Sequence, residues 1–227
     1  MKRVAAPDAA AWDRIVRALR KRLAAELSER PPSVSRIARD GNEPFRVLVA
    51  TMISLRTKDA VTEKAAARLL HAAPDPRSLA RLGEERIGRL IYPAGFYRTK
   101  AVHLRETARL LLAEHGGLVP EDMEALLRLP GVGRKTANLV RNLGFGRDAI
   151  CVDTHVHRIS NRTGWVATGS PEQTEKALME ILPRRHWIPI NELLVKFGQT
   201  VCTPLSPRCG SCPIDSHCAR VGVVRSR

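Results

Sequence analysis

Helical periodicity is the strongest feature of this chain, and it restricts the fold to the all-α class. Between Trp12 and Leu27, apolar residues recur three or four positions apart, as they do on one face of a helix. The segment 45–55 follows Pro44 and is more buried, and further helices are predicted over 59–73, 98–117, 133–146, 171–183 and 191–202. Several of these segments end at Gly or Pro, and none alternates in the manner of a strand. We therefore predict a compact protein made of helices with short connections.

Composition and charge indicate a folded protein with a polyanionic partner. The chain has 227 residues, of which 44% are hydrophobic, and this is enough for one or two domains with their own cores. Lys and Arg outnumber Asp and Glu by 38 to 23, and the net charge of +15 favours nucleic acid as the partner. The base composition of the genome is a second explanation for part of this excess of arginine.

The sequence predicts a cytoplasmic protein without a membrane partner. No segment approaches the roughly 18 apolar residues that a membrane span needs, and the N-terminus lacks the apolar region of a signal peptide. In a reducing compartment the five cysteines are not expected to form structural disulfides.

A glycine-rich turn, LPGVGRKTA, covers Leu129 to Ala137 between two predicted helices. It is not a phosphate loop, because Arg134 stands where that motif has a glycine before its lysine. Gly131 and Gly133 permit positive φ and a close approach of the backbone to a ligand. Amides around Val132 and at the start of the following helix would suit a phosphate, without regard to sequence. An ordinary turn between two helices explains the glycines equally well.

Lys135 and Asp153 are candidates for chemistry. Lys135 falls in the first turn of its predicted helix, where the helix dipole and Arg134 disfavour a cation. That suits an amine that sheds its proton to attack a sugar carbon and form a Schiff base, although a solvated lysine is the simpler interpretation. Asp153 resembles a helix N-cap, because Val156 and Ile159 would face inward on the helix that follows. Its alternative role is to stabilise the positive charge on a sugar as its base leaves.

Four cysteines form a group near the C-terminus with the spacing C-x6-C-x2-C-x5-C: Cys202, Cys209, Cys212 and Cys218. This spacing predicts one metal site and is equally compatible with zinc and with a [4Fe-4S] cluster. Cys151 lies apart from the group and is predicted to be a buried free thiol.

Three motifs resemble the endonuclease III family, DNA glycosylases of the helix-hairpin-helix superfamily with a Gly/Pro-rich loop and an aspartate. They are LPGVGRKTANLV, VDTHVHRISNRTGW and the cysteine group, and the similarity runs from about Pro44 to Cys218. The resemblance implies two helical domains flanking a DNA-binding cleft. A six-helix barrel domain would cover 37–147, with the hairpin at about 129–136. A discontinuous iron-sulfur cluster domain would cover 1–36 plus 148–227.

The resemblance also implies an activity and a set of roles. Lys135 would be the Schiff-base lysine and Asp153 the catalytic aspartate of a bifunctional DNA glycosylase/AP lyase that removes oxidised pyrimidines and nicks the strand by β-elimination. The four cysteines would hold a structural [4Fe-4S] cluster, which presents basic residues such as Arg208 and Arg220 to DNA. Further DNA contacts are expected at Gly131, Val132, Gly133, Arg134, Thr136 and His155. The partner would be double-stranded DNA with damaged bases or abasic sites, bound by a monomer associated with the nucleoid.

The sequence departs from the family on the surface expected to read DNA. Arg56 replaces a common glutamine that fills the space left by the flipped nucleotide, and Phe96 replaces a common leucine that wedges into the opposite strand. The fork of donors on an arginine matches guanine better than adenine, so we expect guanine as the orphan base. The alternative is that Arg56 contacts a phosphate. Adenine-removing relatives carry a glutamate where this chain has Thr51 and Met52, which argues against adenine removal. Two alternatives remain: a uracil or thymine mismatch glycosylase, and a non-catalytic DNA-binding module.

Overall fold

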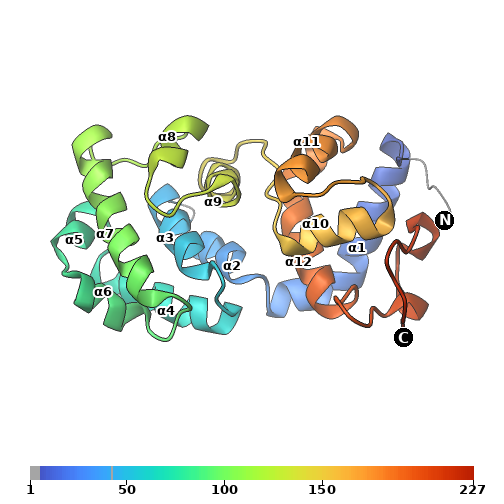
Figure 1. The fold of residues 1–227 in the computed structure, drawn as a ribbon, viewed down its shortest axis with the longest axis horizontal. Helices are drawn as coiled ribbons and strands as arrows, with labels where there is room; N and C mark the ends of the chain where they lie inside the picture. The colour runs from blue at the N-terminus through green and yellow to red at the C-terminus, as the bar shows by residue number, and fades with distance from the viewer. Residues whose placement is uncertain (1–5, 42) are drawn as a thin grey trace. The chain divides into compact units, whose positions relative to one another are not determined.

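The structure is a computed structural model that describes residues 6–41 and 43–227. Within those residues the chain forms twelve α-helices, four short 3-10 or π-helical segments and no strand, so the prediction of an all-α fold is confirmed (Figure 1). The α-helices are α1 Ala9–Glu29, α2 Ser33–Asp40, α3 Pro44–Ser54, α4 Asp59–Ala72, α5 Pro76–Arg81, α6 Glu84–Ile91, α7 Tyr97–Glu114, α8 Met123–Arg128, α9 Arg134–Leu139, α10 Thr154–Thr163, α11 Pro171–Ile181 and α12 Trp187–Thr200. None of the helices in the described ranges has the length and apolarity needed to cross a membrane.

The chain divides into two compact units, each with its own core. The terminal unit combines the residues up to Pro32 with Asp148–Arg227, and the central unit is Ser33–Arg147.

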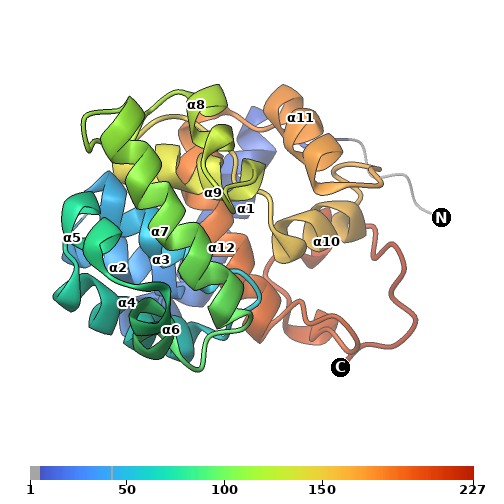
Figure 2. The ribbon, with the colours of Figure 1, turned by 60° about the vertical axis from the view of Figure 1, so that its left-hand side comes forward.

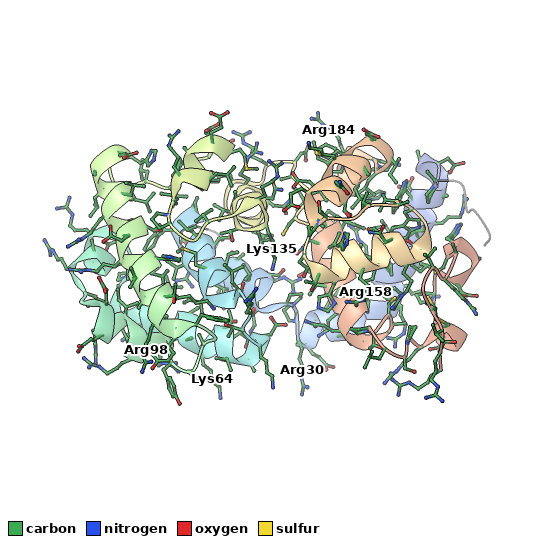
Figure 3. All side chains as sticks on the ribbon, viewed as in Figure 1. Arg30, Lys64, Arg98, Lys135, Arg158 and Arg184 are labelled. Carbon is green, nitrogen blue, oxygen red and sulfur yellow. The ribbon has the colours of Figure 1, made fainter. Side chains whose placement is uncertain are left out.

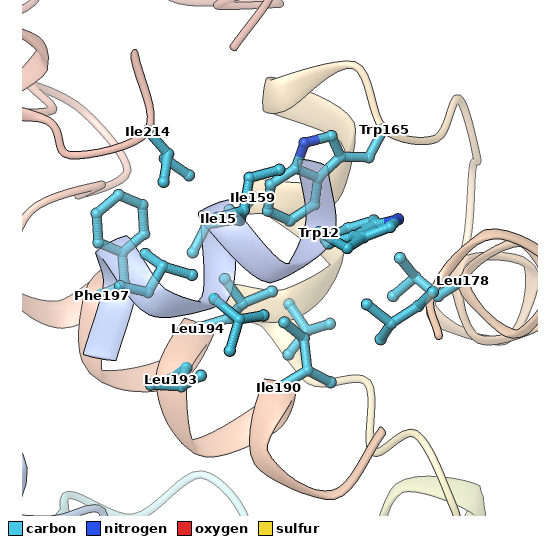
Figure 4. Packing of buried hydrophobic residues seen from close by; sticks show 14 of the residues in the cluster. Trp12, Ile15, Ile159, Trp165, Leu178, Ile190, Leu193, Leu194, Phe197 and Ile214 are labelled. Atoms are coloured by element: carbon cyan, nitrogen blue, oxygen red, sulfur yellow. The ribbon is translucent and has the colours of Figure 1, made fainter. Parts of the chain in front are cut away.

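The terminal unit is built on the apolar faces of α1, α10, α11 and α12. The residues of α1 predicted to face inward are buried from Trp12 to Leu23, among them Ile15 and Leu19, whereas Leu27 is half-buried. Figure 4 shows Trp12 and Ile15 packed with Ile159 of α10 and Leu194 of α12. The rings of Trp12 and Trp165 meet edge to face, with centroids 4.6 Å apart. Spacing of apolar residues along each helix therefore accounts for the core of this unit.

The central unit is organised around α3, which is almost entirely buried. Helices α2, α4, α7 and α9 pack against it, and Pro44 starts it at a position where a proline costs no hydrogen bond. Helix α7 lies beside α5 and α6 in both ribbon views (Figures 1 and 2). A buried central helix explains why the segment 45–55 is mostly apolar, with Arg46 and Ser54 only half-buried.

Short helices are where the structure adds most to the prediction. Helices α2, α5 and α6 were not predicted, and each has only six to eight residues, too few turns for the helical period to stand out. The helix predicted over 133–146 changes character inside its range. Regular α-helix ends at Leu139, and a π-helical segment, Val140–Gly144, continues it.

Candidate active site

Helices α8 and α9 form a hairpin joined by a tight turn at Leu129–Gly133. The amide of Val132 donates to the carbonyl of Leu129 at 3.0 Å and closes this turn. Gly131 has a φ of +75°, and a Cβ there would lie 2.7 Å from Nδ1 of His103, so only glycine fits. The hydroxyl of Thr107 donates to the carbonyl of Pro130 at 3.2 Å. The turn is therefore fixed against α7.

Gly133 differs from Gly131, because it does not adopt the positive φ that a glycine permits. Its φ is −100°. A Cβ at this position would point into open space, with no atom of the surrounding structure within 4 Å. Gly133 is also exposed. Folding of the turn does not need a glycine here, whereas a ligand approaching the backbone would.

Lys135 lies in the first turn of α9, half-buried, and Figure 3 marks its position. Arg134 beside it is exposed. The side chains of Val132 and Thr136 are buried, so these two residues can meet a ligand only through their main chain. The amides of a first helical turn have no acceptor within their own helix. The hairpin thus places an amine beside main-chain donors.

Asp153 caps α10, as the sequence predicts. Its Oδ1 accepts hydrogen bonds from the amides of His155 and Val156, both at 2.9 Å. Because one carboxylate oxygen makes both capping bonds, the cap does not require Oδ2. The predicted cap is compatible with a second role for this carboxylate.

His155 is packed into the terminal unit beside α12. Its Nδ1 lies 3.3 Å from Nη2 of Arg158, and a Cβ on Gly198 would come within 2.4 Å of the same nitrogen. Arg158 in turn donates to the carbonyl of Cys202 at 2.9 Å. The first turn of α10 is therefore connected to the residue where the cysteine group begins.

The four cysteines Cys202, Cys209, Cys212 and Cys218 line one pocket. Burial, assisted by neighbouring thiols and Asp215, raises the pKa of Cys212 to about 11, and burial raises the pKa of Cys218 as well. In the described part of the chain, no three His, Cys, Asp or Glu side chains converge closely enough to hold one metal ion. Cys151 is buried and is not part of a disulfide, as predicted.

Arg162 was not predicted, although it holds the cysteine loop in place. It is 9% exposed, and its Nη1 donates to Sγ of Cys202 at 3.3 Å and to the carbonyl of Thr203 at 2.8 Å. Its own carbonyl accepts from the amide of Val221 at 2.8 Å. The sequence did carry a signal, because Arg162 continues the buried stripe of Ile159 on α10.

Arg208 and Arg220 differ from each other in the structure. Both are exposed, but Nε and Nη2 of Arg220 donate to Oδ1 of Asp215, at 3.0 and 2.7 Å. Arg220 is therefore exposed and also ion-paired within the loop, and its contact with DNA stays a prediction.

Arg56 and Phe96 come together in the central unit. The guanidinium carbon of Arg56 lies 5.5 Å from the ring centroid of Phe96, within the range of a cation–π interaction. Both residues have positive φ, +52° and +57°, and Phe96 is 62% exposed.

Thr51 and Met52, where adenine-removing relatives carry a glutamate, are buried in α3. The hydroxyl of Thr51 donates a hydrogen bond to the carbonyl of Val47.

Comparisons with known proteins identify the family to which this chain belongs. A profile of the HhH-GPD superfamily of base excision DNA repair proteins matches residues 49–184. Endonuclease III of Thermotoga maritima is 49% identical over 187 residues, which cover 82% of this chain and 88% of that protein.

Solved structures give the same result. The chain is similar to endonuclease III in a non-covalent complex with DNA, with a TM-score of 0.79 and 33% identity over 92% of this chain and 95% of the other. It is also similar to endonuclease III in a trapped covalent intermediate with DNA, with a TM-score of 0.77 and 32% identity over 92% and 96% of the two chains. The chain therefore belongs to the HhH-GPD superfamily and, within it, to the endonuclease III family.

Proposed function

We propose that this protein is a bifunctional DNA glycosylase and AP lyase of base excision repair, which removes oxidised pyrimidines and cuts the strand. One observation carries the proposal: Lys135 lies in the first turn of the hairpin helix α9, in a chain of the endonuclease III family. An amine can form a covalent Schiff base with a sugar, and endonuclease III has been trapped as a covalent intermediate with DNA. The substrate is double-stranded DNA with damaged bases or abasic sites, bound by a monomer.

In the proposed reaction, Nζ of Lys135 attacks C1′ of the damaged nucleotide, and the base leaves with the electrons of the glycosidic bond. Opening of the sugar ring and loss of a proton from the nitrogen give the Schiff base. Removal of a C2′ proton then expels the 3′ phosphate, and water releases the lysine. Asp153 would stabilise the positive charge that develops on the sugar, while its Oδ1 keeps the two capping bonds.

The hairpin supports a grip on the DNA backbone. Amides at the start of α9 suit a phosphate, and the exposed backbone of Gly133 leaves room for one to approach. Arg134 is exposed beside them and adds positive charge. Contacts of this kind do not depend on sequence, which a repair enzyme needs because lesions occur anywhere. We assign His155 to the same role from the terminal unit.

Four cysteines around one pocket fit a [4Fe-4S] cluster, and we assign Cys202, Cys209, Cys212 and Cys218 as its ligands. The hydrogen bond from Arg162 to Sγ of Cys202 is of the kind that supports thiolate ligands. A bound cluster would cross-link the loop, so its role here is structural. We assign the cluster domain to the terminal unit and the hairpin domain to the central unit, and we expect the protein at the nucleoid in the cytoplasm.

Borohydride trapping on duplexes that carry different lesions tests the proposed activity. Wild-type protein should form a covalent complex with oxidised pyrimidines, because borohydride reduces a Schiff base to a stable amine. Lys135→Gln should form none, while its Kd for the same duplex stays within about tenfold. The control is Lys64→Gln, which changes an exposed lysine of α4 and should trap normally. Trapping only with uracil or thymine opposite guanine would favour the mismatch glycosylase, and no trapping with any duplex would refute lyase activity.

The two glycines of the hairpin should respond differently to alanine. Gly133→Ala should leave stability within about 0.5 kcal/mol of wild type, since there is room for a methyl group, yet weaken duplex binding about tenfold. Gly131→Ala should destabilise the fold by roughly 1–3 kcal/mol because of its positive φ and the contact with His103. Urea unfolding and fluorescence anisotropy measure the two effects. Unchanged DNA affinity in Gly133→Ala would show that the turn does not meet the backbone.

Metal analysis tests the cluster. Purified protein should be yellow-brown with about four irons per chain and little zinc. Cys202→Ser should lose iron and weaken DNA binding, whereas Cys151→Ser removes a buried thiol outside the pocket and should keep the full iron content. Colourless protein with one zinc per chain would contradict the assignment.

A further inference from the structure

Lys100 is a buried lysine for which the proposed reaction has no use. It lies in the first turn of α7 and is 7% exposed. Its Nζ donates to the carbonyls of Ile53 and Leu55, both at 2.6 Å, and to the hydroxyl oxygen of Thr57 at 2.9 Å. With its three donors already engaged, this amine is not available as a second nucleophile.

The three acceptors of Lys100 lie at the end of α3 and on both sides of Arg56. Leu55 is the C-cap of α3, where backbone carbonyls lack partners within the helix and the helix dipole favours a cation. Burial lowers the pKa of Lys100 to about 8, so the amine still carries its charge at pH 7. One ammonium therefore closes α3 and holds the residues before and after Arg56.

The same network reaches Phe96. Thr57 accepts a hydrogen bond from the amide of Gly95 at 3.1 Å, and the amide of Lys100 donates to the carbonyl of Phe96 at 3.0 Å. A Cβ on Gly95 would lie 2.4 Å from the carbonyl oxygen of Arg56, so the two loops touch backbone to backbone. Lys100 is thus bonded to both loops that carry the exposed pair.

The pair itself needs such support. Arg56 and Phe96 both adopt a left-handed backbone conformation that residues other than glycine rarely adopt. Conformations of this kind persist where surrounding contacts over-determine them, and they gather at functional sites. The exposed ring of Phe96 and the guanidinium of Arg56 form one unit on the surface.

We infer that Lys100 is a positioning residue, which fixes the Arg56–Phe96 pair in the geometry that reads the strand opposite the lesion. This inference rests on the proposed function, because it assigns a DNA-reading role to the pair. It predicts that the contribution of Arg56 to duplex binding depends on Lys100, although Lys100 itself does not touch DNA.

A double-mutant cycle on DNA binding tests the inference without relying on catalysis. The probe is a duplex with a tetrahydrofuran abasic analogue opposite guanine. Arg56→Gln should raise the Kd about fivefold in the wild-type background but less than about twofold in Lys100→Met. Equal factors in both backgrounds, or no effect of Arg56→Gln in either, would overturn it.

Two further variants separate positioning from general stability. Lys196→Met is the matched control, because Lys196 is also buried and donates to one backbone carbonyl, that of Arg30, in the terminal unit. It should leave the effect of Arg56→Gln at about fivefold. Thr57→Val removes one acceptor of Lys100 and should reduce the effect even if Lys100→Met does not fold. An unreduced effect in Thr57→Val would also count against the inference.

Cleavage of an abasic site in single-stranded DNA completes the design, because that substrate has no opposite strand to read. Lys100→Met should cleave it within about twofold of the wild-type rate. A large loss there would show that Lys100 supports the whole unit instead of the pair. If wild-type protein cleaves an abasic site in neither single-stranded nor double-stranded DNA, the lyase proposal fails, and the binding cycle still decides the role of Lys100.

Discussion

The Arg56–Phe96 pair of the central unit depends on the hydrogen bonds that the charged amine of Lys100 makes at the end of the buried helix α3. Helix α3 is buried in the core, and its last carbonyls lie next to the loop that contains Arg56. Unpaired carbonyls at such a place would be costly, and the protonated amine of Lys100 donates to two of them, those of Ile53 and Leu55. Its third hydrogen bond goes to the hydroxyl oxygen of Thr57. Core, loop and the start of α7 are joined at this one group. An exposed arginine can therefore hold an unfavourable backbone conformation.

The terminal unit uses the same principle with a different cation. The segment that follows α12 contains only short 3-10 turns in its described residues, so few of its carbonyls are paired by regular structure. Arg162 reaches from α10 and donates to the carbonyls of Thr203 and Pro204, both at 2.8 Å, and to Sγ of Cys202. A cluster bound by the cysteines would stabilise a loop that is already anchored to the helical core.

Sequence reasoning succeeded where the relevant neighbours are close along the chain. The long helices α1, α4 and α7 repeat their apolar pattern over several turns. The amides that Asp153 caps at the start of α10 lie within three residues of it. Lys135 and the cysteine group could be nominated for the same reason, because each belongs to a short motif.

Lys100 and Arg162 could not be found this way. The acceptors of Lys100 lie 43 to 47 residues away along the chain, and those of Arg162 lie 40 to 42 residues away. The one signal in the sequence is that each residue lies on the apolar face of its helix, Lys100 beside Leu104 in α7 and Arg162 beside Ile159 in α10. A charged residue on an apolar stripe predicts a buried partner, but it does not say which one.

The central claim is that the amine of Lys135 attacks the sugar, and peptide mapping of the borohydride-trapped complex tests it most directly. After nuclease and trypsin digestion, mass spectrometry should find the nucleotide remnant on the peptide 135–141, KTANLVR, because modified Lys135 is no longer cut by trypsin. The peptide 136–141, TANLVR, which trypsin releases when Lys135 is unmodified, should decrease in proportion to the trapped fraction. A remnant on any other lysine, or on the N-terminal amine, would contradict the account.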